Sequence, residues 1–111
     1  MTSMNFETLP IHLLSKKKVL DNWIAYPASE AEPPRVDLIV NQEIWGLLDY
    51  LEKYVFVNRL GILISKNGYN SRVFNYQREY LGSYTCNFPQ NPVSCRIQMT
   101  NQNKVGSRYS L

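Results

Sequence analysis

The sequence predicts an α+β domain in which one amphipathic helix packs on an antiparallel β-sheet. Three observations predict it: a helical period of apolar residues from about 42 to 56, an Asn-Gly dipeptide typical of a hairpin turn, and two strand-like runs near the carboxyl end. The chain has 111 residues, which suits a single small domain with one core. We assign this domain to residues 1–100 and expect residues 101–111 to form a flexible polar tail.

The first 26 residues hold two short apolar clusters separated by a run of lysines at 16–18. Thr8 is a suitable cap for a helix with Pro10 in its first turn, but the lysines interrupt the apolar stripe. Two strands joined at the lysines explain the pattern equally well, so both interpretations stay open. Residues 27–35 contain three prolines, which remove backbone donors and fix φ, and they predict an exposed loop inside the domain.

A short buried strand is predicted at Val36–Val40, with Asp37 at its entrance as a turn or edge residue. A helix is expected to follow, with Asn41 as its N-cap and Glu43 in its first turn. Apolar side chains then recur at helical spacing and predict one buried face, made of Ile44, Leu47, Leu48, Leu51, Tyr54 and Val55. Trp45 and Tyr50 lie beside this stripe, where they either cover the edge of the core or are exposed as candidate anchors for a partner.

A second apolar run, Arg59–Lys66, is read as a strand, because Asn67-Gly68 directly after it is typical of a type I′ turn. Residues 71–81 alternate in the way a strand with one solvated face does. A helix from 71 to 81 is the competing interpretation, and the Asn-Gly turn favours the strand. On that strand four side chains share one face: Arg72, Tyr76, Arg78 and Tyr80.

Two further strands are predicted at Ser83–Phe88 and Val93–Thr100, joined by a loop that contains two prolines. A hairpin centred on this loop places Cys86 directly opposite Cys95. We expect these cysteines to be reduced core thiols, as is normal for a cytosolic protein, and a disulfide is the alternative.

The helix and the run that follows it also resemble a piece of restriction-endonuclease-like folds, over about 25 residues. Those nucleases hold a metal ion with an Asp and a Glu-x-Lys triplet. The triplet at the matching place here is Ile64-Ser65-Lys66, which has no carboxylate, so we do not assign the chain to that family.

Catalytic, cofactor and metal motifs are absent from the sequence. His12 is the only histidine, the two cysteines do not form a Cys-x-x-Cys, and the five glycines do not cluster. We therefore expect a protein that is not an enzyme and uses no metal, cofactor or small-molecule substrate. With no membrane-length apolar run and no secretory signal, we expect it in the cytoplasm, away from membranes.

Charge is distributed unevenly along the chain. Residues 1–56 carry five bases and eight acids, a net charge of −3, whereas residues 57–111 carry seven bases and one acid, a net charge of +6. The second half also holds five of the eight tyrosines. Arginine and tyrosine together are enriched at protein interfaces and also suit a ligand made of phosphates and stacked bases.

Two functions follow from this composition. The first is a protein-interaction module or subunit of a larger assembly, with a protein partner or a second copy of the chain, anchored by Trp45 and Tyr50 or by the arginine and tyrosine face. The alternative is a domain that binds single-stranded nucleic acid through that face, with the four residues from Arg72 to Tyr80 named above as its contacts.

Overall fold

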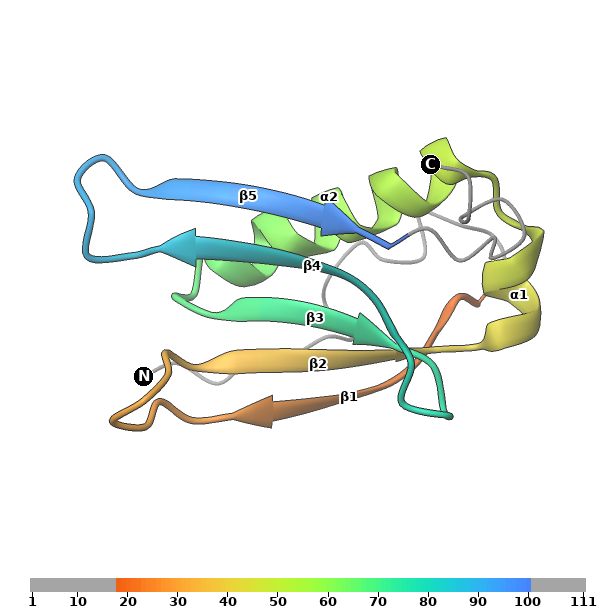
Figure 1. Cartoon of the computed structure of the whole chain (residues 1–111), viewed down its shortest axis with the longest axis horizontal. Helices are drawn as coiled ribbons and strands as arrows, with labels where there is room; N and C mark the ends of the chain where they lie inside the picture. Colours follow the sequence, from red (N-terminus) through yellow and green to blue (C-terminus); the bar gives the residue numbers. More distant parts are fainter. Residues whose placement is uncertain (1–17, 101–111) are drawn as a thin grey trace.

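In the computed structural model, residues 18–100 form one five-stranded sheet and two helices (Figure 1). The strands are β1 (Leu20–Tyr26), β2 (Arg35–Val40), β3 (Asn70–Phe74), β4 (Tyr80–Asn87) and β5 (Ser94–Met99). The helices are α1 (Gln42–Leu47) and α2 (Tyr50–Ser65). The strands lie side by side in sequence order, and α2 packs along one face of the sheet, mainly against β4 and β3. The α+β class is therefore confirmed.

The sheet is mixed, so the prediction of a purely antiparallel sheet is wrong. Strands β2 and β3 run parallel, and the other neighbouring pairs run antiparallel. The parallel pair arises because α2 carries the chain from the end of β2 back to the start of β3, which a tight hairpin turn cannot do.

The single helix predicted from about 42 to 56 is two helices. Asn41 caps α1 as expected, with its side chain accepting a hydrogen bond from the Ile44 N–H. Leu48 is extended and ends α1. Asp49 then begins α2 with a capping box, in which its side chain accepts from the Glu52 N–H while the Glu52 side chain accepts from the Asp49 N–H.

The break between the helices also shifts the buried face from the predicted one, of which Ile44 and Leu48 still pack against the core. Leu47 and Leu51 are 68% and 66% exposed, although the apolar period placed them in the core. The residues of α2 that face the sheet are Phe56, Val57, Leu60, Gly61 and Ile64. They pack over the apolar side of the central strands, where Val36, Leu38, Val73 and Leu81 are buried.

The strand predicted at Arg59–Lys66 is wrong, because this segment forms the last turns of α2 and the helix C-cap. Asn67-Gly68 therefore ends a helix: Gly68 has a φ of +82° and donates its N–H to the Ser65 carbonyl. The resemblance to nuclease folds depended on a strand at this place and ends with it.

Three further predictions about the secondary structure are confirmed in their main features. Residues 27–33 form an exposed connection, residues 36–40 form a buried strand, and the last two strands form a hairpin with Cys86 paired to Cys95. These cysteines are joined by a disulfide, so the expectation of reduced thiols is wrong. Of the two interpretations of residues 1–26, the structure shows a strand at Leu20–Tyr26. Residues 1–17, with His12, and the tail at 101–111 lie outside the described residues.

Candidate binding face

One side of the sheet is covered by α2, and neither described helix packs on the other side, which we call the open face. Because side chains alternate along a strand, the residues between the core positions point to this face. Arg35 and Asp37 of β2 are such residues, and the parallel register places Asp37 beside Arg72 of β3. The next pairings continue the row across the sheet, from Arg72 to Ser83, and Thr85 is paired with Arg96.

A pocket of about 350 Å³ lies on the open face, where β1, β2 and β3 meet the turn between β3 and β4. Basic, aromatic and aliphatic side chains form its wall together with one buried carboxylate. The residues that line it are Asn22, Ile24, Tyr26, Arg35, Asp37, Ile39, Arg72, Phe74, Asn75, Tyr76 and Arg78.

Asp37 organises the charges in this pocket. Its Oδ1 and Oδ2 accept hydrogen bonds from Arg72 Nε and Nη2, each at 3.1 Å, and its Oδ1 also accepts from Arg35 Nε at 3.4 Å. Arg35 reaches Glu32 as well, through a bond of 2.9 Å. The hydrogen bond to Asp37 is the main cause that raises the pKa of Arg72 above its usual value. The two guanidinium groups are therefore held in fixed positions on the face.

Aromatic rings lie directly against these guanidinium groups. The Arg35 guanidinium carbon is 4.2 Å from the centre of the Tyr26 ring, and that of Arg72 is 5.1 Å from the centre of the Phe74 ring. The Phe74 ring also contacts that of Tyr80, with 6.0 Å between their centres. The open face thus carries alternating cationic planes and rings.

The turn between β3 and β4 is built on Asn75, which is 1% exposed. Its Oδ1 accepts hydrogen bonds from the N–H groups of Gln77 and Glu79, and its Nδ2 donates to the Gln42 and Glu79 side chains. The turn holds Arg78 at a φ of +66°, an uncommon backbone conformation for a residue with a side chain. This strained residue lines the pocket and forms no ion pair with any described residue.

The structure brings together most of the residues that the sequence singled out. Arg72, Tyr76 and Arg78 line one pocket, although the strand predicted through them ends at Phe74. Tyr80 begins β4 beside that pocket. Of the two interpretations of Trp45, the partner anchor is wrong, because Trp45 is 1% exposed and packs edge-on against Phe56 in the core.

Tyr50 is exposed, as a partner anchor must be, but it lies at the start of α2 against Tyr54 and away from the open face. Sequence reasoning missed Arg35, Asp37 and Asn75. Arg35 and Asp37 could have been found because they alternate with apolar residues. The segment was interpreted instead as a uniformly buried strand.

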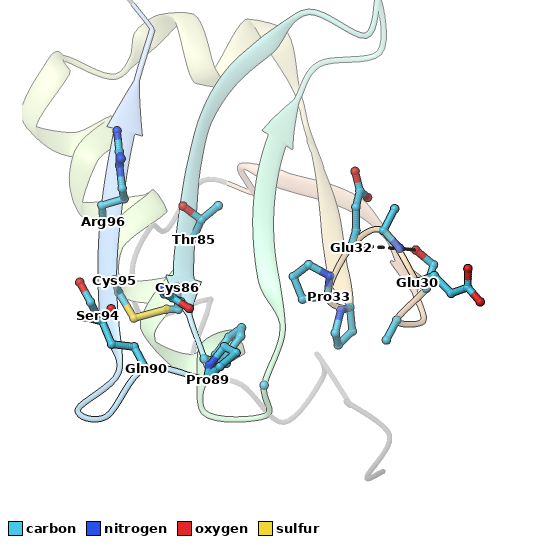
Figure 2. Close-up of a pocket in the computed structure, with 17 residues that line it drawn as sticks. Glu30, Glu32, Pro33, Thr85, Cys86, Pro89, Gln90, Ser94, Cys95 and Arg96 are labelled. Atoms are coloured by element: carbon cyan, nitrogen blue, oxygen red, sulfur yellow. Dashed lines mark hydrogen bonds between the residues drawn. A yellow bond between two sulfur atoms is a disulfide. The ribbon is translucent and has the colours of Figure 1, made fainter.

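A second hollow, of about 930 Å³, lies at the other end of the sheet between the connection at 28–34 and the hairpin of β4 and β5 (Figure 2). Glu30 and Glu32 stand on one side of it, while Arg96 and the disulfide stand on the other. Its charged groups do not converge, so the open-face pocket is the better candidate site.

Residues 18–100 contain no group of three or more residues of the types His, Cys, Asp or Glu placed to hold a metal ion. Over the same range neither helix has the length and apolar character needed to cross a bilayer. No family model, curated protein or solved structure shows significant similarity to this chain. The site must therefore be interpreted from its own geometry.

Proposed function

We propose that this domain binds single-stranded nucleic acid on the open face. The observation that carries the proposal is one pocket, on a sheet face with no described helix over it, which is lined by three arginines and three aromatic residues. Single-stranded ligands are bound by sheets of this kind because unstacked bases lie flat on rings and guanidinium planes while cations neutralise the phosphates.

The charge of the pocket sets how strong the phosphate contribution is. Arg35, Arg72 and Arg78 supply three positive charges and Asp37 removes one, so the lining carries a net charge of +2. Neutralising two or three phosphates gives a slope of log K against log salt of roughly −1.4 to −2.1 for a single strand. We therefore expect binding that weakens with salt, but less steeply than for a long basic groove.

Stacking supplies the other part of the affinity. Tyr76 is 61% exposed and Tyr80 is 37% exposed, so both offer ring surface to a ligand. Each base stacked on such a ring contributes about 1–3 kcal/mol. Asp37 supports this role because it fixes the Arg72 guanidinium beside the Phe74 ring.

The charge contribution is tested by fluorescence anisotropy with a labelled single-stranded DNA of mixed sequence, about 12 nucleotides long, as suits a small domain. Arg78→Glu is expected to weaken binding about tenfold or more, because it reverses the charge that has no acidic partner among the described residues. Arg59→Glu is the matched control, since Arg59 is exposed on α2, on the other side of the sheet. Equal affinities for the two variants would contradict the proposal.

The stacking contribution is tested with two tyrosines of similar exposure. Tyr76, at 61%, lines the pocket, and Tyr50, at 64%, lies on α2. Tyr76→Ala should weaken binding by about 1–3 kcal/mol, whereas Tyr50→Ala should leave it unchanged. A wild-type chain that binds no oligonucleotide at low salt would end the proposal.

A protein-interaction module is the second candidate. The observation that favours it is a cluster of exposed apolar side chains where α1 meets α2, formed by Leu47, Tyr50 and Leu51. A module that docks a protein there loses its partner with Tyr50→Ala and is insensitive to Tyr76→Ala. The same two variants therefore separate the two functions.

A further inference from the structure

We propose that β5 is an interface between two copies of this chain, which pair antiparallel through this strand about a twofold axis at Ile97. The inference is independent of nucleic-acid binding. It starts from the two edges of the sheet, which are β1 and β5 (Figure 1). An edge strand offers unpaired N–H and C=O groups to another chain unless something blunts it.

The β1 edge is blunted. Its register with β2 shifts between Leu20 and Asn22, which marks an irregularity of the bulge type. The Trp23 N–H, one residue further, donates to the Asn22 side-chain Oδ1 at 2.8 Å. By contrast, β5 pairs with β4 from Ser94 to Met99 without a shift. A regular edge of this kind is the better template for another strand.

Two hydrogen bonds show which groups of β5 point outward. In an antiparallel pair, residues alternate between those that bond to the partner and those whose N–H and C=O point away from it. The Thr100 N–H donates to the Leu81 carbonyl, so this pair is of the bonded kind. The Cys86 N–H donates to the Asn70 side chain, on the side away from β5. Cys86 and its partner Cys95 therefore form a pair whose backbone groups do not bond to each other. The alternation then leaves the backbone groups of Cys95, Ile97 and Met99 facing outward, with no partner among residues 18–100.

The outward groups of two copies complement each other when the strands pair antiparallel about an axis at Ile97. With the axis at Ile97, the residue pairs Ile97 with Ile97 and Cys95 with Met99 of the second copy each exchange two hydrogen bonds. The same register sets Arg96 opposite the neutral Gln98 of the second copy. An axis at Arg96 also joins outward-pointing groups, but it places two like charges directly opposite each other, so it is disfavoured.

The open face extends across such a dimer. Arg96 is paired with Thr85 and lies on the open-face side of β5. The twofold axis therefore places the Arg96 side chain of each copy beside the sheet of the other copy. The contact is one strand wide, and interfaces this small give weak complexes, so we expect a dissociation constant of about micromolar order. The dimer therefore forms as the protein concentration rises and dissociates as it falls.

The first test is sedimentation of the full chain, with its disulfide intact and no nucleic acid present. We expect a reversible change from 13.0 kDa to twice that mass as concentration rises. Ile97→Pro removes one outward N–H and should give a monomer, because proline is tolerated at an edge where that N–H bonds nothing. Ile97→Ala loses similar packing but keeps the N–H, so it should still dimerise.

The second test checks the register and does not depend on how well the proline variant folds. Gln98 is exposed and lies opposite Arg96 of the second copy. Gln98→Glu should tighten the dimer about 2- to 30-fold, and Gln98→Lys should weaken it by a similar factor, since two symmetric charge pairs change together. A monomer at every concentration, a dimer that survives Ile97→Pro, or equal affinities for the two Gln98 variants would overturn the inference. None of these results depends on whether the chain binds oligonucleotides.

Discussion

Asp37 and Arg72 are joined by two hydrogen bonds across the only parallel pair of strands among the described residues, from Arg72 Nε to Oδ1 and from Nη2 to Oδ2. They come from opposite halves of a chain whose first 56 residues are acidic and whose remainder is basic. Part of this charge asymmetry is therefore neutralised inside the fold. What stays available to a ligand is the fraction without acidic partners, which includes Arg78.

The first prediction concerns the stability that this ion pair provides. The Asp37 side chain is 11% exposed, while that of Arg72 is 37% exposed, so solvent screens part of the interaction. Asp37→Asn keeps the shape but removes the charge that both arginines share. We expect the free energy of unfolding to fall by about 1–3 kcal/mol in urea titration. Glu32→Gln, which breaks a pair with a 59% exposed carboxylate, should cost less than about 0.5 kcal/mol.

A second prediction fixes which face of α2 is buried. Leu60 is fully buried beneath the sheet, and Leu51, in the first turn of the same helix, is 66% exposed. Leu60→Ala should lower the free energy of unfolding by about 2–5 kcal/mol. Leu51→Ala should change it by less than about 0.5 kcal/mol. The opposite order would show that the helix is turned toward the face that the apolar period of the sequence indicated.

The errors in reading this helix have a physical cause. The apolar run from Leu60 to Ile64 suits a helix and a strand equally, because a short run has no distinguishing period. The Asn-Gly dipeptide after it is a hairpin turn or a helix end, depending on what precedes it. The signal that decides between them was Asp49 with Glu52 three residues later, a capping box that begins a new helix.

The hairpin of β4 and β5 was predictable because its pattern is local. Alternation on both strands and prolines in the loop set the register that pairs Cys86 with Cys95. The open face was only partly predictable. Arg72, Tyr76 and Arg78 were grouped by an assumed strand, and they meet instead because Asn75 folds the chain into a turn. Arg35 and Asp37 join them through a parallel pairing, which depends on the path of α2 and has no local pattern.

A third prediction tests how closely α2 lies on the sheet. A Cβ at Gly61 would overlap the Cβ and Cγ of Tyr84, whereas a Cβ at Gly46 in α1 meets nothing within 4 Å. Gly61→Ala should therefore cost about 1–3 kcal/mol through overpacking. Gly46→Ala should be neutral or stabilise by up to about 1 kcal/mol, because alanine is the better helix former. Thermal unfolding of both variants makes the comparison.

A fourth prediction concerns the disulfide. Cys86 and Cys95 are nine residues apart, so the bridge closes a short loop and stabilises the chain by about 2–3 kcal/mol through the unfolded state. The double variant Cys86→Ala with Cys95→Ala should lose this amount in urea titration without reductant. Adding reductant should destabilise the wild type and leave the variant unchanged. A wild type that does not respond to reductant would show that the cysteines are not bridged in solution.

The last prediction separates stability from function at Arg78. Its φ of +66° costs roughly 1–2 kcal/mol for a residue with a Cβ, and glycine does not carry this cost. Glycine also has more conformational entropy than arginine in the unfolded chain. This entropy favours unfolding and cancels about 0.4–1 kcal/mol of the stability gained by removing the strain. Arg78→Gly should therefore leave the free energy of unfolding equal or raise it by up to about 1.6 kcal/mol.

Oligonucleotide binding should fall in the same variant, because the guanidinium without an acidic partner is gone from the pocket. Parallel urea and anisotropy titrations of one preparation give both quantities. A protein that becomes more stable while it binds less well would indicate that the strained turn is kept for the side chain it presents. If Arg78→Gly instead unfolds more easily and binds as the wild type does, the arginine serves the turn and not the ligand.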